Sequence, residues 1–143
     1  MRITVLTYLE EEGSKEHDIV VDQVVEALKE GGHEASILGV HADLKKMLGG
    51  LEKQKPELIF NLLEMFGKSL SADIAVAGLL DLLCLRYTGS GPGELYLGQD
   101  KGLAKKIFAF EKILYPDFAI FSNDAGLETG GNLRMPLFVK PLR

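Results

Sequence analysis

The sequence predicts an α/β fold in which a parallel sheet is covered by helices on both faces. Short apolar runs rich in β-branched residues alternate with segments whose apolar residues recur at helical spacing. The connections between the runs are long enough to hold a helix, as parallel strands require. The composition, 46% hydrophobic and 26% charged over 143 residues, is that of a globular protein with a substantial core.

The first part of the chain is expected to contain four strands with three helices between them. The expected strands are 3–8, 35–40, 57–62 and 86–88, and the expected helices follow Ser14, cover 42–51 and cover 71–83. Ser14 is placed as the N-cap of the first helix because a serine hydroxyl accepts a backbone N–H well. Gly31 and Gly32 end that helix, and Pro56 ends the second. The third helix is apolar on nearly every side, which indicates a buried helix or an interface.

After Gly93 the pattern changes. Asp100 is expected to cap a helix that reaches Leu114. The sequence then predicts a strand over 118–121, a loop or poorly formed helix over 122–134, and a final strand over 136–140. Because this tail is too short to cover a sheet, we predict a first domain of residues 1–97 and an incomplete second unit of residues 98–143.

Composition excludes several classes of protein. The net charge of −5 argues against non-specific binding of nucleic acid, which needs a basic face. No apolar stretch approaches the ~20 residues that span a bilayer, so we expect a cytoplasmic protein. Cys84 is the only cysteine, and its apolar surroundings predict a buried, inert thiol. His17, His33 and His41 lack the spacing of metal ligands, so no protein metal site is expected, and the last two are expected at the surface.

Ligands of parallel α/β sheets lie beyond the carboxyl ends of the strands, which here are segments 8–14, 61–67 and 89–93. Five recognisable motifs follow one another along the chain. They are Ser14-Lys15-Glu16-His17-Asp18, Ile59-Phe60-Asn61, the helix end 78–83, Tyr87-Thr88-Gly89-Ser90-Gly91 with Asp100-Lys101, and Pro136-Leu137-Phe138-Val139-Lys140-Pro141. Taken in order, they resemble the D-alanine–D-alanine ligase-like ATP-grasp family, in its amino-terminal domain and the start of its ATP-grasp module.

The resemblance implies a Rossmann-like pre-ATP-grasp domain, followed by an incomplete ATP-grasp segment. It implies that Glu16 positions the substrate amine and that Lys101 and Lys140 bind the nucleotide. It also places four residues on the substrate side: Ser14, His17, Asn61 and Glu64. An intact member of the family would use ATP and magnesium to activate a carboxylate as an acyl phosphate in peptidoglycan synthesis. Because the family's metal ligands lie further downstream, the 143-residue polypeptide is expected to be catalytically silent.

Departures from the family pattern leave alternatives open. Glu64 stands where the ligases carry histidine, so D-alanine as the substrate remains an open question. A receiver-like or flavodoxin-like signalling module is a second hypothesis, although the third strand ends in Asn61 and not in aspartate. A third is a structural unit that forms a homodimer through the apolar helix 71–83.

Overall fold

The computed structural model describes residues 1–14, 16–69, 71–122, 126–130 and 132–142. The chain divides into two compact units, Met1–Pro92 and Gly93–Arg143. The elements are β1 (Arg2–Tyr8), α1 (Ile19–Glu30), β2 (Glu34–Val40), α2 (Leu44–Gln54), β3 (Leu58–Leu62), α3 (Ala72–Leu82), α4 (Pro92–Gln99), α5 (Lys101–Phe110), β4 (Phe118–Ser122) and β5 (Gly126–Gly130). Within the described residues, no helix combines the length and the apolar character that crossing a membrane requires.

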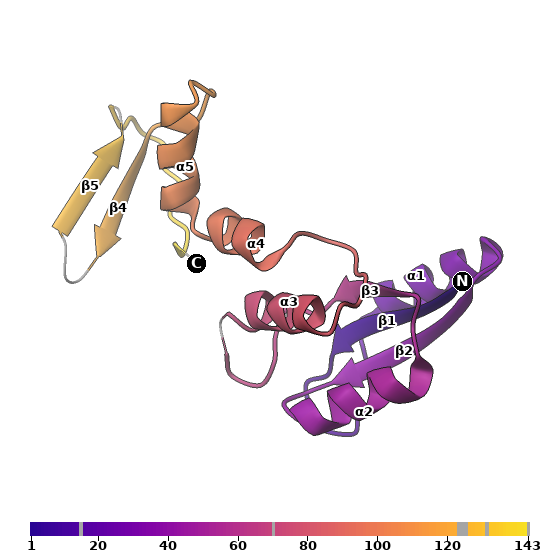
Figure 1. Cartoon of the computed structure of the whole chain (residues 1–143). Coiled ribbons are helices and arrows are strands. Elements are labelled where there is room, and N and C mark those ends of the chain that lie inside the picture. Colours follow the sequence, from indigo (N-terminus) through magenta and orange to yellow (C-terminus); the bar gives the residue numbers. More distant parts are fainter. Residues whose placement is uncertain (15, 70, 123–125, 131, 143) are drawn as a thin grey trace. The chain divides into compact units, whose positions relative to one another are not determined.

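β1 is the central strand of the amino-terminal unit. It pairs in parallel with β2 on one side and with β3 on the other (Figure 1). Leu6 lies opposite Leu38 of β2 and Asn61 of β3, so the three strands end at the same edge. The strand is buried on both faces, and its two threonines, Thr4 and Thr7, are buried together with its apolar residues.

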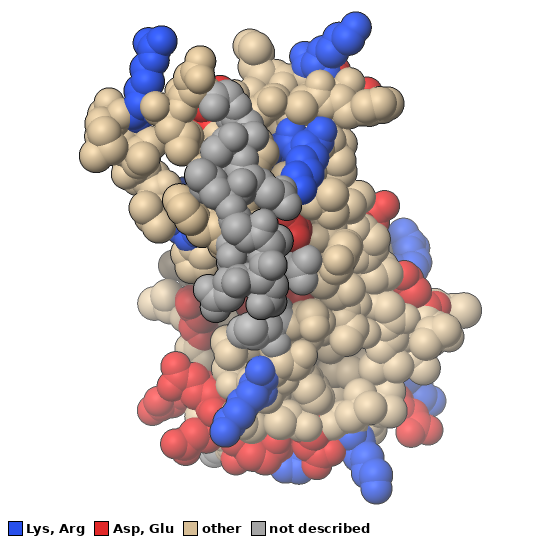
Figure 2. Space-filling view, turned by 90° about the vertical axis from the view of Figure 1, so that its left-hand side faces the viewer, with Lys and Arg blue, Asp and Glu red and all other residues tan. Residues whose placement is uncertain are grey.

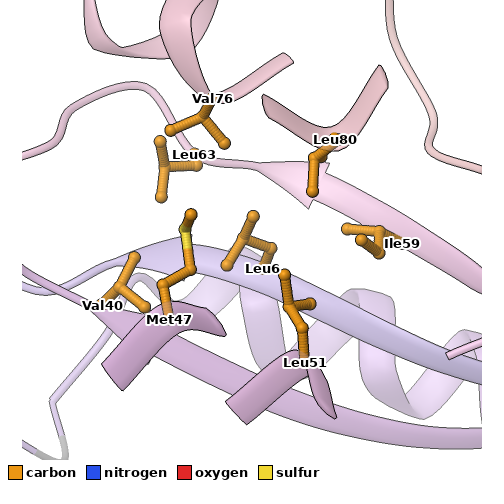
Figure 3. Close-up of a cluster of buried hydrophobic side chains, with 8 residues drawn as sticks. All are labelled: Leu6, Val40, Met47, Leu51, Ile59, Leu63, Val76 and Leu80. Atoms are coloured by element: carbon orange, nitrogen blue, oxygen red, sulfur yellow. The ribbon is translucent and has the colours of Figure 1, made fainter. Parts of the chain in front are cut away.

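Helices cover both faces of this sheet. Successive side chains of a strand point to opposite faces, and β1 divides its residues in this way. Leu6 belongs to a cluster with residues of α2 and α3 (Figure 3): Leu6, Val40, Met47, Leu51, Ile59, Leu63, Val76 and Leu80. Val5 packs on the other face with Val21 and Val25 of α1. The expected α/β class is therefore confirmed.

Two predictions for the amino-terminal unit need correction. The expected fourth strand is only an isolated parallel bridge between Ile59 and Tyr87. The cap of α1 is Asp18 and not Ser14, because the Asp18 carboxylate accepts the N–H of Val20 at 2.8 Å. The helix thus begins later than the serine suggested, and Ser14, Glu16 and His17 precede its cap.

The carboxyl-terminal unit agrees with the sequence only in part. As expected, Asp100 caps α5, and its carboxylate accepts the N–H of Leu103 at 2.9 Å. Gly126–Gly130 was expected to be loop or helix but is β5, because pairing with β4 supplies its backbone hydrogen bonds. Residues 123–125 and 131 of the expected loop or helix over 122–134 lie outside the described residues. The final strand expected over 136–140 is wrong, since this stretch has no strand partner in the described part of the chain.

Cys84 is exposed, which contradicts the prediction of a buried thiol. It follows α3 in the left-handed conformation, with φ of 54°. Its N–H donates to the Asp81 carbonyl at 2.9 Å, and the Leu85 N–H donates to the Leu80 carbonyl at 3.0 Å. These two bonds form a Schellman motif, whose left-handed position is usually glycine. The turn carries the thiol away from the core although its neighbours in sequence are apolar.

Replacing Cys84 with glycine is expected to raise the free energy of unfolding by about 0.5–1 kcal/mol. Glycine removes the strain of the left-handed conformation, and its greater freedom in the unfolded chain offsets part of the gain. Urea denaturation measures the change. Leu83→Gly is the matched control, because Leu83 has φ of −82° and glycine there should destabilise. Equal effects of the two substitutions would contradict the explanation.

Candidate functional site at the carboxyl edge of the sheet

The loops that follow β1, β2 and β3 meet at one edge of the parallel sheet, because all three strands end there. In Figure 1 the strands of this unit point toward the left, and Figure 2 looks onto that side. Figure 2 shows acidic side chains gathered over the lower part of the view, where the amino-terminal unit lies, with fewer lysine and arginine side chains among them. Such a surface favours the cationic part of a ligand.

The β1–α1 loop is attached to the β2–α2 region. The N–H of Leu9 donates to the Val40 carbonyl at 2.7 Å. Further along, the Lys46 ammonium donates to the Glu12 carboxylate at 2.6 Å. This hydrogen bond lowers the pKa of Glu12 and raises that of Lys46. The side chains of Glu10, Glu11 and Glu12 are exposed, and the ion pair with Lys46 attaches Glu12 to α2.

Three predicted site residues lie in this loop. The half-buried Ser14 accepts the backbone N–H of Glu16 on its hydroxyl at 3.0 Å. Glu16 is exposed, so its carboxylate is accessible to a cationic group. His17 is half-buried, and its Nε2 lies 3.0 Å from the carboxylate of Asp22. The loop therefore carries an exposed carboxylate next in sequence to an imidazole held by an aspartate.

The other two substrate-side candidates lie at the end of β3. The side-chain oxygen of Asn61 accepts the backbone N–H of Leu63 at 3.2 Å. The backbone N–H of Asn61 donates to the Thr88 hydroxyl at 3.0 Å. Asn61 thus joins β3 to the glycine-rich turn, where Gly89 has φ of 100°. Glu64 is exposed. The side-chain amide of Asn61 thus accepts a hydrogen bond from the backbone of its own loop. A receiver-like signalling module would need an aspartate at this position.

Sequence reasoning missed His41, which was expected at the surface and is half-buried. Its Nδ1 lies 2.8 Å from the Leu9 carbonyl, and its ring centroid lies 5.5 Å from that of Tyr8. Its own carbonyl accepts the N–H of Gly67 at 2.8 Å. The signal that could have found it is its position, since it directly follows β2 at the ligand edge.

The two predicted nucleotide lysines belong to the carboxyl-terminal unit. Both the backbone N–H and the Nζ of Lys101 approach the Leu142 carbonyl, at 3.3 and 3.4 Å. A Cβ on Gly102 would lie 3.3 Å from the Leu142 side chain, so the tail passes close to the start of α5. Lys140 is exposed and lies two residues before Leu142. The fold therefore brings the segment that carries Lys140 to Lys101.

This arrangement suits a polyphosphate better than it suits a metal ion. Exposed ammonium groups can pair with phosphate oxygens. The start of α5 already has the Asp100 carboxylate as its cap, so the helix end itself is not a free anion site. In the part of the chain that the structure describes, no three His, Cys, Asp or Glu side chains gather as metal ligands. The two lysines do not fit a magnesium site, because ammonium groups cannot act as metal ligands.

Fold and site together define an α/β protein whose parallel-sheet unit carries polar loops at its carboxyl edge, followed by a second unit in which the structure describes the helices α4 and α5 and the hairpin of β4 and β5. No protein-family model matches the chain. D-alanine–D-alanine ligases do match it. The ligase of Neisseria meningitidis serogroup C is 34% identical over 134 residues, which is 90% of this chain and 41% of the ligase. Those of Zymomonas mobilis and Rhodospirillum rubrum are 32% and 31% identical over 119 residues, 83% and 82% of this chain.

The chain belongs to the D-alanine–D-alanine ligase-like family and corresponds to the amino-terminal part of these relatives. It spans about two-fifths of their length, with shares of 35%, 37% and 41% in the three named.

Proposed function

We propose that this chain is the amino-terminal part of an ATP-dependent ligase that joins a carboxylate to an amine. The observation that carries the proposal is the similarity to D-alanine–D-alanine ligases over 82–90% of the chain. Residues 1–97 would be the pre-ATP-grasp domain and residues 98–143 the start of an ATP-grasp subdomain. The protein would act in the cytoplasm on a small amino acid, in the synthesis of peptidoglycan precursors.

Each candidate residue has a role that its chemistry allows. ATP, when bound, would supply the phosphoryl group that activates the substrate carboxylate. Lys101 and Lys140 would neutralise its phosphate oxygens, because ammonium groups pair well with that charge. The exposed carboxylate of Glu16 would pair with the ammonium group of the substrate. Ser14 would hold Glu16 through the bond between its hydroxyl and the Glu16 N–H.

His17, Asn61 and Glu64 would complete the substrate side of the site. His17 is held by Asp22, and Asn61 fixes the start of the loop that carries Glu64. We also propose that two copies pair through α3, where Leu82 is 83% exposed and would be covered by its counterpart. Light scattering on the purified chain tests this pairing, and a strict monomer would exclude it.

The 143-residue chain is expected to release no phosphate above the blank when incubated with ATP, magnesium and D-alanine. A chimera that joins it to the remaining part of the Neisseria meningitidis ligase is expected to form the dipeptide. Lys101→Ala in the chimera should lower kcat/KM about tenfold, the effect of losing one charged hydrogen bond. Lys53→Ala, an exposed lysine of α2, is the control and should have no effect.

Two outcomes would contradict the proposal. Phosphate release by the chain alone would show that it is not silent. A chimera with a folded circular-dichroism spectrum that forms no dipeptide from D-alanine or from other amino acids would show that this chain is not the front part of such a ligase.

A further inference from the structure

His41 links two loops that carry all five of the candidate substrate residues. The β1–α1 loop carries Ser14, Glu16 and His17, and the end of β3 with its following loop carries Asn61 and Glu64. His41 binds the first loop through its ring and the second through its backbone carbonyl. His41 directly follows β2, which lies on the opposite side of β1 from β3.

The second attachment shows the path of the β3 loop. β2 and β3 lie on opposite sides of β1, yet Gly67 donates its N–H to the His41 carbonyl at 2.8 Å. The loop 63–67 therefore crosses the carboxyl end of β1. Gly67 has φ of 59°, and a Cβ there would lie 3.2 Å from the Cβ of Ala42. The close approach at this crossing favours glycine.

The contact between His41 and Leu9 shows that Nδ1 of the His41 ring carries a proton. A carbonyl oxygen can only accept, so Nδ1, 2.8 Å from the Leu9 carbonyl, carries the proton. The Tyr8 ring, tilted by 37°, packs against the imidazole and restricts its rotation. The hydrogen bond and the ring contact add to the bond from the Leu9 N–H to the Val40 carbonyl at 2.7 Å, and together these contacts hold the start of the β1–α1 loop against the end of β2.

We propose that His41 is the positioning residue of the substrate site: its side chain holds the β1–α1 loop in place relative to the β3 loop that its backbone holds. This inference rests on the proposed ligase function for the meaning of the site. It concerns a small amino acid as ligand, whose ammonium group Glu16 would meet. His41 acts through the loops and needs no contact with the substrate.

Two substitutions separate the hydrogen bond from the ring contact. His41→Phe keeps an aromatic ring against Tyr8 and removes the Nδ1 donor. His41→Asn keeps an N–H donor near the same position and removes the ring. Any residue at position 41 retains the carbonyl that Gly67 binds, so the crossing of the β3 loop is an internal control.

Amide hydrogen exchange of the full 143-residue chain gives the first measurement. In His41→Phe, the amides of Ser14 and Glu16 should exchange about five- to tenfold faster, the effect of losing one hydrogen bond. The amides of Val5 and Gly67 should keep their rates. In His41→Asn, all four amides should exchange as in the wild type. Unchanged rates in His41→Phe, or an equal rise at Val5, would overturn the proposal.

Titration of the labelled chain with D-alanine, and with L-alanine as a second probe, gives the functional measurement. Shifts of the Glu16 and Asn61 amides report binding. We expect affinity to fall about five- to tenfold in His41→Phe and to be retained in His41→Asn. Equal affinity of His41→Phe and the wild type would overturn the positioning role. If neither amino acid shifts these amides in the wild type, the substrate part of the proposed function fails, and the exchange rates still decide the role of His41.

Discussion

Replacing Leu80 with alanine is expected to lower the free energy of unfolding of the amino-terminal unit by about 2–5 kcal/mol. Leu80 of α3 is 0% exposed and belongs to the cluster that contains Leu6 and Ile59 (Figure 3). The substitution removes apolar surface from the core and leaves a cavity at the contact between α3 and the sheet. Since domains are stable by only about 5–15 kcal/mol, this loss is a large share of the total.

Leu82→Ala is the matched control for this prediction. Leu82 lies in the same helix and is 83% exposed in the single chain, so its truncation should change the free energy by less than about 0.5 kcal/mol at dilutions at which the chain is monomeric. Urea denaturation of the full chain, followed through the NMR signals of the β1 amides, measures the amino-terminal unit separately. Similar losses for both leucines would mean that α3 does not pack on the sheet through Leu80.

Replacing Gln54 with alanine is expected to lower the free energy of unfolding by about 1–3 kcal/mol. The hydroxyls of Thr4 and Ser36 donate to the side-chain oxygen of Gln54 at 2.6 and 2.8 Å. The Gln54 amide donates to the Ile37 carbonyl at 3.1 Å. Thr4 is only 1% exposed, so the truncation leaves its hydroxyl buried without this partner.

A double-mutant cycle tests the cause of this loss. Thr4→Val removes the buried hydroxyl, so adding it to Gln54→Ala should recover about 1 kcal/mol of the loss. The free energies come from urea denaturation, with Lys53→Ala as the control at the exposed neighbouring position. Strictly additive losses would show that the Thr4 hydroxyl gains nothing from Gln54, and the hydrogen bond would then not explain the effect.

Several features could be predicted because they depend on neighbours in sequence. The β-rich run of β1 predicted a buried strand, and the helical spacing of Val21 and Val25 predicted a helix that covers the sheet. Asp100 was recognised as a cap because its carboxylate needs only the next turn of α5. The same local reasoning chose Ser14 over Asp18, since both residue types are good caps and stand in the same short segment.

Other features depend on groups that are distant in sequence. β5 exists because β4 supplies its hydrogen-bond partners, although its own composition is polar and rich in glycine. Cys84 is exposed because the Schellman turn ends α3 before the apolar run ends. The part played by His41 depends on Leu9 and Gly67, which lie on loops from two other strands.

By itself, the sequence determined the α/β class, the buried strands and their helices, and the motifs of a ligase-like family, because periodicity, caps and turn residues act over a few neighbouring positions. Only the tertiary structure decided which loops meet at the carboxyl edge, that the β3 loop crosses the end of β1 to reach His41, and that the Leu142 segment lies against Lys101. These contacts join residues up to about forty positions apart, and their energy is gained only when the whole sheet or unit has formed.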